Sequence, residues 1–341
     1  MAPEDAQNLQ SDWHRPVPKS ISPKYMAEAL CGALEIDEFN NLVREQRSEI
    51  FKDALNKDAV RVLLDLPKLE QIVDGPGNAI SQADIYTNAH MIRLVDIHHR
   101  SGKTPSAVAA DNIAKGATLR FRNIEQYDPL LIEFAKYVSA AYAATTEINV
   151  YLTPPGHAGF PPHFDNKDVF IVQVAGSKLW SLYPSYTNRV PLPDPETPWD
   201  PDTYQPIGKG LQHQLKAGDV LYIPRGEMHS ALCTQEESLH LTISLKSISI
   251  ADLLLKEIKR IARTDLALRQ RAPWSLDDSA EDHARLAQVL HSQLISIADQ
   301  LEPALSLDTG RTQATYVDGR DDQTVLQTTI TALKEMQTRK L

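Results

Sequence analysis

Cysteine is scarce in this chain, and targeting segments are missing from it. Its 341 residues include two cysteines, Cys31 and Cys233, too few for a disulfide framework. The N-terminus lacks the basic stretch and apolar run of a signal peptide. No apolar run approaches the roughly 20 residues that span a bilayer. We therefore expect a soluble cytoplasmic protein without a membrane partner.

Positive charge is also in deficit. Lysine and arginine number 35 against 45 aspartates and glutamates, which gives a formal net charge of −10. Such a balance predicts no direct binding of nucleic acid, although a local basic patch would be compatible with it. Apolar residues make up 42% of the chain, which is enough for a sizeable core in one large domain or two modest ones.

The pattern of the chain divides into three regions: 1–114, 115–250 and 251–341. Residues 1–114 begin with a polar, proline-containing arm (1–24) and continue with helical and strand elements expected to support the next region. A helical pattern runs from about Ala27 to Ala59. A strand is predicted over 61–66 and a short helix over 104–113.

Residues 115–250 predict a mostly β core. Short strands recur at roughly 8–12 residues, which is typical of an antiparallel barrel or sandwich. Asp128 and Pro129 are expected to begin a helix, and Gly176 is expected to turn one strand back into the next. The proline-rich segment 184–206 reads as a surface loop that shapes substrate access. The strands are expected over 117–122, 148–153, 168–174, 178–183, 219–223 and 239–245.

Residues 251–341 predict amphipathic helices with apolar stripes at helical spacing. Two interpretations carry equal weight. The stripes either pack onto the barrel or form the interface of a homodimer. Residues 306–325 are polar, and a final short helix is predicted over 325–336.

The motif His163-Phe-Asp165, with His229 far downstream, points to a metal site. Residues at i and i+2 of a strand face the same side, so His163 and Asp165 can reach one ion. Two histidines and one carboxylate hold Fe(II) on one face and leave open positions. In the segment Gly218-Asp-Val-Leu-Tyr-Ile-Pro224-Arg-Gly226-Glu-Met-His229, a strand and a tight turn fix the approach of the second histidine. These three residues are therefore predicted as both the metal ligands and the catalytic centre.

The other histidines compete less well as ligands. His240 could replace His229, but the turn before His229 favours the latter. His157 reads as a solvent or substrate contact in a glycine-containing loop. The remaining candidates lack a partner at ligand spacing and are expected to be structural: His98, His99 and His213.

Open positions on such an iron suit a chelating 2-oxo acid and O2. The affinity order does not select iron over manganese, nickel or zinc. Lys178 alternates with Trp180 and Leu182, so it faces the barrel interior if they do. A buried ammonium is costly without an anion, and the distal carboxylate of 2-oxoglutarate would fit. The alternative is a surface lysine at a hairpin turn.

Five segments together carry a resemblance to the JmjC/cupin oxygenases of the ribosomal-oxygenase type, over about residues 115–250. It implies a double-stranded β-helix, Fe(II), 2-oxoglutarate and O2, and hydroxylation of an amino-acid side chain in a protein or peptide. It also implies that Lys178 pairs with the 2-oxoglutarate C5 carboxylate, and that Asn149, Tyr151 and Ser244 line the co-substrate pocket. From the residues alone, these last three could equally satisfy a buried polar layer. The segments are Asn149-Val-Tyr-Leu-Thr-Pro-Pro-Gly, Pro-Pro-His163-Phe-Asp165, 168–180, 215–229 and Ser238-Leu-His-Leu-Thr-Ile-Ser244.

The chain departs from the general cupin pattern at three positions. Asp165 replaces a second histidine, Val169 stands where a glutamate ligand would fall, and Cys233 replaces an asparagine. Residues 251–305 resemble a helical dimerisation segment, and the remainder is too short for a complete winged helix, which we expect to be truncated or absent. Two alternatives stay open: N-methyl demethylation, and a metal-binding cupin without O2 chemistry, against which a buried Lys178 would argue.

Overall fold

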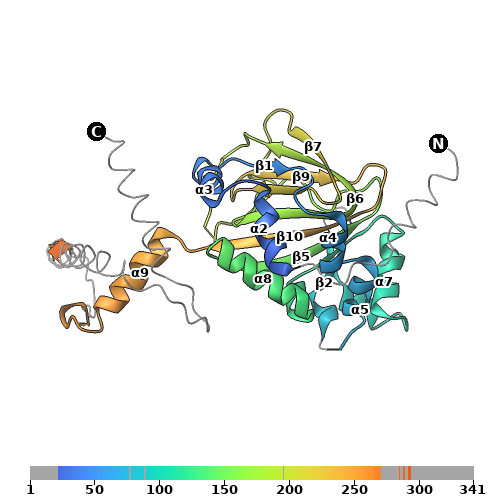
Figure 1. The fold of residues 1–341 in the computed structure, drawn as a ribbon, viewed down its shortest axis with the longest axis horizontal. Coiled ribbons are helices and arrows are strands. Elements are labelled where there is room, and N and C mark those ends of the chain that lie inside the picture. Colours follow the sequence, from blue (N-terminus) through green and yellow to red (C-terminus); the bar gives the residue numbers. More distant parts are fainter. Residues whose placement is uncertain are drawn as a thin grey trace. The chain divides into compact units, whose positions relative to one another are not determined.

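The computed structural model describes residues 22–269 except 77, 88, 89 and 195, together with 284, 287, 288, 291 and 292. Its ribbon is drawn in Figure 1. The chain forms two compact units, Met1–Ser247 and Ile248–Leu341. Residues 1–21 of the arm predicted over 1–24 lie outside the described residues, as do most residues of the amphipathic helices predicted after residue 269 and the final helix predicted over 325–336. Residues 23 and 24 of the predicted arm are instead the start of a helix, α2 (Pro23–Glu28). No helix in the described part is both long and apolar enough to cross a membrane.

The first unit is built on antiparallel strands, as the alternating pattern predicted. The main sheet runs in the order β1-β8-β6-β10-β5-β4-β2-β3, while β7 and β9 pair with the second half of β6. This is the predicted mostly β core with helices, a double-stranded β-helix. The strands are β1 (Glu49–Phe51), β2 (Ala83–Thr87), β3 (His90–Arg93), β4 (Thr118–Phe121), β5 (Ala144–Thr153), β6 (Asp168–Tyr183), β7 (Leu211–Lys216), β8 (Val220–Ile223), β9 (Met228–Leu232) and β10 (Ser238–Ser247).

The predicted hairpin turn at Gly176 is wrong. β6 runs unbroken from Asp168 to Tyr183, pairing first with β8 and β10 and then with β7 and β9. Its register with β10 shifts near Ala175, and Gly176 has φ +61°. A bulge with a left-handed glycine bends a strand without reversing it. Gly176 therefore marks the point at which β6 passes from pairing with β8 and β10 to pairing with β7 and β9.

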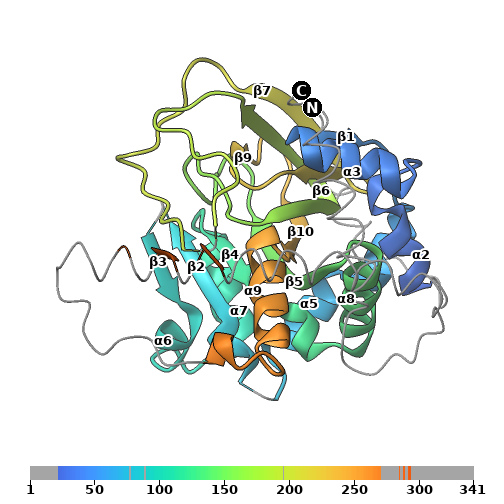
Figure 2. The ribbon, with the colours of Figure 1, turned by 90° about the vertical axis from the view of Figure 1, so that its left-hand side faces the viewer.

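Helices cover the outer face of the main sheet. Figures 1 and 2 show α2 (Pro23–Glu28) beside α8 (Pro129–Ala141). α8 begins as predicted, because the Asp128 side chain accepts hydrogen bonds from the Leu130 and Leu131 amides. Phe39 of α3 (Ile36–Glu45) packs on Phe170 of β6, with ring centroids 5.4 Å apart. This contact joins the N-terminal helices to the core of the sheet.

The helical interpretation of residues 27–59 was partly wrong, and the strand predicted over 61–66 was wrong. A strand, β1, interrupts it, and the strand predicted over 61–66 is instead the end of α4 (Lys57–Leu63) and the start of α5 (Leu66–Val73). Asn56 and Asp65 cap the two helices by accepting hydrogen bonds from backbone amides. These caps outweigh the strand propensity of the apolar run that they flank.

The helix predicted over 104–113 is confirmed as α7 (Pro105–Ile113), capped by the Thr104 hydroxyl. Both cysteines are buried and free. The remaining short elements of the first unit are α6 (Leu94–His98) and three 3-10 turns, η1 (Ala29–Cys31), η2 (Ala79–Gln82) and η3 (Ile124–Tyr127).

The described part of the second unit is α9 (Ile250–Ile261) followed by η4 (Ala267–Arg269). Ser249 and Asp252 form a capping box at the start of α9. Leu254 and Leu255 of this helix are exposed. A homodimer through the C-terminal helices, and domain boundaries at 115 and 251, stay predictions.

Candidate metal centre and co-substrate cavity

Two chain segments bring His163, Asp165 and His229 together. The ligand atoms of the three side chains lie within 4.8 Å of one another. His163 and His229 face each other in an antiparallel bridge, in which each backbone amide donates to the other residue's carbonyl at 2.9 and 2.7 Å. This backbone pairing places the two imidazoles side by side.

Both imidazoles are oriented for metal binding. His163 Nδ1 lies 2.9 Å from the Pro161 carbonyl, and His229 Nδ1 lies 3.0 Å from the Glu227 carbonyl. A carbonyl can only accept, so each Nδ1 carries the proton and each Nε2 presents a lone pair. His229 Nε2 is 3.7 Å from Asp165 Oδ2, a separation that one ion could bridge. The donor set therefore fits a divalent metal held on one face.

Burial also keeps the imidazole of His229 in the neutral form that binds a metal. Desolvation, then the neighbouring His163, lowers the pKa of His229 to about 4. The imidazole is therefore neutral at physiological pH and needs no deprotonation to bind a cation.

A tight turn before His229 locks it to the other two ligands. Gly226, with φ +81°, donates its amide to the Asp165 carbonyl at 2.8 Å. Tyr186, from the loop after β6, donates its hydroxyl to the Gly226 carbonyl at 2.8 Å. A Cβ at position 226 would lie 2.6 Å from Pro193, so only glycine fits here. The sequence signal Pro-x-Gly-x-x-His thus has a structural cause.

The triad opens into a cavity of about 470 Å³, here called the metal cavity. Lys178 lines it and is 3% exposed, which excludes the surface alternative. Its ammonium donates to Thr153 Oγ1 at 3.0 Å, and no carboxylate of the described residues pairs with it. Burial lowers the pKa of Lys178 to about 8. The ammonium is therefore placed to bind an anion that the described residues do not supply.

Three buried polar atoms of residues that line the metal cavity have no hydrogen-bond partner among the described residues: Trp180 Nε1, Trp199 Nε1 and His240 Nδ1. His240 is stacked on Tyr151, with ring centroids 5.0 Å apart. Burial, followed by the nearby Lys178, lowers the pKa of His240 well below its usual range. His240 therefore lies in the cavity as a neutral ring, outside the group of three ligands.

The predicted pocket residues divide into two sets. Tyr151 lines the metal cavity together with Lys178 and the triad, whereas Asn149 and Ser244 are not among its lining residues. Asn149 accepts a hydrogen bond from the Asn123 amide at 3.1 Å. The roles of Asn149 and Ser244 stay predictions.

Sequence reasoning missed several residues that line the metal cavity, here called the rim: Tyr86, Arg120, Phe160 and Trp199. Tyr86 and Phe160 pack with ring centroids 4.4 Å apart, and the Arg120 guanidinium lies over Tyr86 at 4.9 Å. Asp84, 1% exposed, holds Arg120 at 2.6 Å. Trp199, from the proline-rich loop, completes the lining, as that loop's expected role suggests. The only available signal was alternation on strands β2 and β4.

The histidines that were not expected to be ligands lie elsewhere. His213 is in β7, opposite Trp180, and His98 and His99 close α6. His157 is exposed and does not line the metal cavity.

A double-stranded β-helix that directs two imidazoles and one carboxylate into a cavity defines a metal-binding cupin-type domain. The family model of the JmjC domain matches residues 120–253 of the chain. The matched residues span β5 to β10 and hold all three ligands and Lys178.

Curated relatives share this region. The chain is 35% identical to ribosomal oxygenase 2 of Mus musculus over 196 residues, covering 55% of this chain and 41% of that protein. It is 31% identical to ribosomal oxygenase 1 of Gallus gallus over 198 residues, covering 56% and 32%. It is 29% identical to the bifunctional lysine-specific demethylase and histidyl-hydroxylase NO66 of Dictyostelium discoideum over 263 residues, covering 74% and 47%. The chain thus spans less than half the length of these relatives.

Among solved structures, the ribosomal oxygenase YcfD of Escherichia coli is similar, with a TM-score of 0.46 and 13% identity over 77% of this chain and 67% of that one.

Proposed function

We propose that this protein is an Fe(II)- and 2-oxoglutarate-dependent oxygenase that hydroxylates an amino-acid side chain of a protein or peptide. One observation carries the proposal. The three predicted metal ligands line the same cavity as a buried ammonium, which has no anionic partner among the residues that the structure describes. A metal alone would not require the ammonium, whereas a chelating dianion would use both.

Different residues of the metal cavity would bind different groups. His163, Asp165 and His229 would hold the iron, which supplies activation of O2 coupled to decarboxylation of 2-oxoglutarate to succinate. Lys178 would neutralise the distal carboxylate of 2-oxoglutarate, replacing water lost on burial. Trp180 Nε1 is a donor without a partner, so it can give a further hydrogen bond to a bound oxygen.

The substrate class follows from the relatives and the rim. The relatives are named as ribosomal oxygenases and histidyl-hydroxylases, which indicates side chains of polypeptides. Tyr86, Phe160 and Trp199 give the cavity flat apolar walls at which one side chain can be held. These rings would orient the target carbon toward the iron and exclude water.

A second candidate, N-methyl demethylation, is favoured by the relatives whose name includes a lysine-specific demethylase. Hydroxylation of an N-methyl carbon releases formaldehyde. Formaldehyde production from methylated peptides, with none of the oxygen retained on a side chain, would select this candidate.

An anaerobic titration tests the main proposal. Fe(II)-loaded protein is titrated with 2-oxoglutarate and followed for the weak visible charge-transfer band of a chelated 2-oxo acid. We expect the band in the unchanged protein and in the surface control Lys246→Met, and a greatly weakened affinity in Lys178→Met. Binding of Fe(II) without any band would instead favour a cupin without O2 chemistry.

A further inference from the structure

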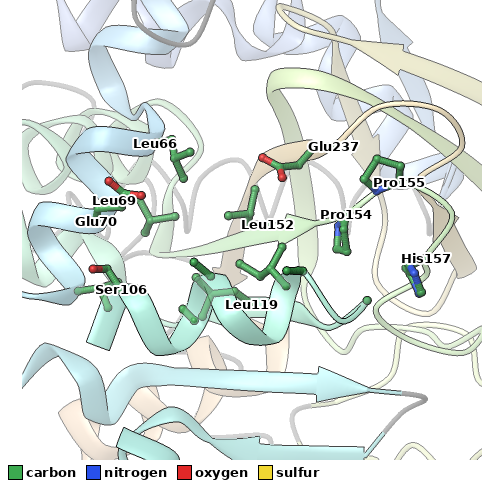
Figure 3. A pocket seen from close by; sticks show the side chains of 16 residues that line it. Leu66, Leu69, Glu70, Ser106, Leu119, Leu152, Pro154, Pro155, His157 and Glu237 are labelled. Carbon is green, nitrogen blue, oxygen red and sulfur yellow. The ribbon is translucent and has the colours of Figure 1, made fainter. Parts of the chain in front are cut away.

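A second cavity of about 480 Å³ lies behind the metal cavity, and we call it the rear cavity (Figure 3). The two cavities share a wall. On β4 and β5, Arg120 and Tyr151 line the metal cavity, whereas their neighbours Leu119 and Leu152 line the rear cavity. Because side chains alternate across a strand, the rear cavity opens on the opposite face of these strands. A ligand there would not compete for the metal.

The lining of the rear cavity is aliphatic with acidic ends. Helices α5 and α7 contribute leucine, valine and alanine side chains, and the loop after β5 contributes two prolines. Glu70 comes from α5, and Glu237 comes from the connection before β10. No lysine or arginine of the described residues lines the space. Apolar walls with carboxylates at the edge are complementary to an apolar stem that ends in a cation.

Of the two carboxylates, Glu237 gives the stronger evidence for a cationic ligand. In Figure 3 its carboxylate points toward the side where Leu66 lies. Among the described residues it has no hydrogen-bond or ion-pair partner, and burial raises its pKa. Its backbone lies close against Gly176, where a Cβ would be 1.7 Å from the Glu237 carbonyl oxygen. A half-buried carboxylate that lines an apolar cavity and has no partner among the described residues favours an external cation.

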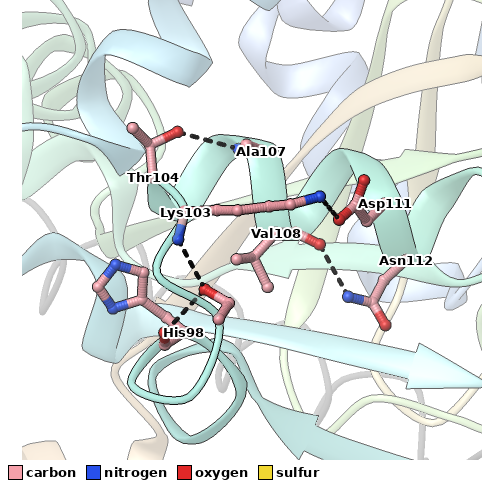
Figure 4. Close-up of polar contacts among 8 residues, drawn as sticks. His98, Lys103, Thr104, Ala107, Val108, Asp111 and Asn112 are labelled. Atoms are coloured by element: carbon pink, nitrogen blue, oxygen red, sulfur yellow. Dashed lines mark hydrogen bonds and ion pairs between the residues drawn. The ribbon is translucent and has the colours of Figure 1, made fainter.

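Hydrogen bonds within the chain hold the helices that form the walls of the rear cavity. Figure 4 shows that Thr104 caps α7 and that Lys103 is bound to Asp111 on the same helix. Ser106 gives its amide and hydroxyl to Asp74 after α5, which ties the two helices together. Lys103, which precedes α7, thus has its charge paired with Asp111 and does not line the cavity.

The loop from β5 to His163 closes the other end. His157 packs on Gly116, where a Cβ would lie 2.3 Å from the ring. The Gly156 amide donates to the Cys233 carbonyl at 2.9 Å, and the Cys233 amide donates to the His157 carbonyl at 3.0 Å. This end of the cavity is thus held by backbone hydrogen bonds.

We propose that the rear cavity binds a lysine or arginine side chain of a polypeptide, flanked by apolar residues. The stem of the basic residue would lie against Leu66, Leu119 and Leu152, and its cationic end would pair with Glu237, with Glu70 adding to the negative potential. The inference does not depend on the oxygenase activity, because binding can be measured on metal-free protein.

The test uses the peptide acetyl-GLKLG-amide, together with two matched peptides in which norleucine or glutamate replaces the lysine. Binding to the metal-free full chain is followed by amide NMR shifts, which also locate the peptide. We expect saturable shifts around Ala110 and His157. We expect about tenfold weaker binding of the norleucine peptide, as for loss of a charge-assisted contact, and no binding of the glutamate peptide.

Three variants locate the site. Glu237→Gln should weaken binding about fivefold, whereas the control Glu236→Gln, a neighbour that does not line the cavity, should leave it unchanged. Ala110→Trp, at an exposed lining position, should fill the space and abolish binding. Equal binding of the lysine and norleucine peptides, equal effects of the two glutamine variants, shifts confined to the metal cavity, or no binding at all would each overturn the proposal.

Discussion

The metal cavity and the rear cavity have nearly equal volumes, about 470 and 480 Å³, and share strands β4 and β5. Their chemistry is opposite. One gathers imidazoles, a buried lysine and aromatic rings, and the other gathers aliphatic side chains and two glutamates. The difference shows how one pair of strands serves two purposes, because every second residue faces the other side. A single-residue change on these strands therefore affects only one cavity.

The two cavities also differ in energetic cost. Lys178 is buried with one neutral hydrogen-bond partner, so the metal cavity holds a group that opposes folding. The rear cavity is lined mainly by apolar side chains whose burial favours folding. We infer that the binding residues of the metal cavity were selected at the expense of stability, which the following predictions test.

The largest expected effect is a loss of turnover in the metal cavity with no change of binding in the rear cavity. His163→Ala or Asp165→Ala removes one of three ligands, so turnover of 2-oxoglutarate should fall by about 10³-fold or more, as for loss of a catalytic group. Oxygen uptake measures it. Binding of acetyl-GLKLG-amide to the rear cavity should stay the same, and a parallel loss of that binding would show that the sites are not independent.

Lys178→Met should change affinity and stability in opposite directions. Affinity for 2-oxoglutarate should fall about 10²-fold to 10³-fold, because one partner of a buried ion pair is lost. The metal-free protein should gain about 1–3 kcal/mol in free energy of unfolding, because a buried charge is replaced by an apolar side chain of similar length. Urea unfolding measures the second effect.

The size of that stability change depends on pH. The folded-state pKa of Lys178, about 8, lies below its unfolded value, so its cost is fully present below pH 8 and fades between pH 8 and the unfolded pKa. Lys246→Met, on an exposed part of β10, serves as the control and should change neither quantity. A destabilised Lys178→Met protein at pH 7 would contradict the account of strain in the metal cavity.

The bulge in β6 places Gly176 against the backbone of Glu237, and this glycine can be tested. Gly176→Ala should cost about 2–4 kcal/mol, since the new methyl group meets the Glu237 carbonyl and the backbone stays left-handed. Gly102→Ala is the matched control, with φ +67° and open space around it, and should cost only about 1 kcal/mol. Thermal unfolding compares them. Equal losses would mean that the contact with Glu237 does not constrain the bulge.

The smallest effect is a pH dependence confined to the metal cavity. Lys178 is charged below pH 8 and neutral above it, so affinity for 2-oxoglutarate should weaken by up to about tenfold per unit above pH 8. Titrations between pH 6.5 and 9.5 measure this dependence. The profile of Lys178→Met should lack this step, and a profile that is equally steep in that variant would assign the step to another group.

Local sequence patterns predicted much of the metal centre. His163 and Asp165 converge because alternation on an extended segment is a local property, and Gly226 is required by a turn that its neighbours already indicate. Asp128 and Pro129 predicted the start of α8 for the same reason. Each of these features depends on residues within a few positions of one another.

Tertiary structure alone decided the rest. Gly176 allows either a reversal or a bulge, and only pairing with β10 on one side and with β7 and β9 on the other selects an unbroken β6. Segments far away in the chain form the surroundings of the rim residue Arg120 and of the Glu237 carboxylate. A sequence encodes which face a side chain takes along a strand, but which other segment meets that face depends on packing across the whole fold.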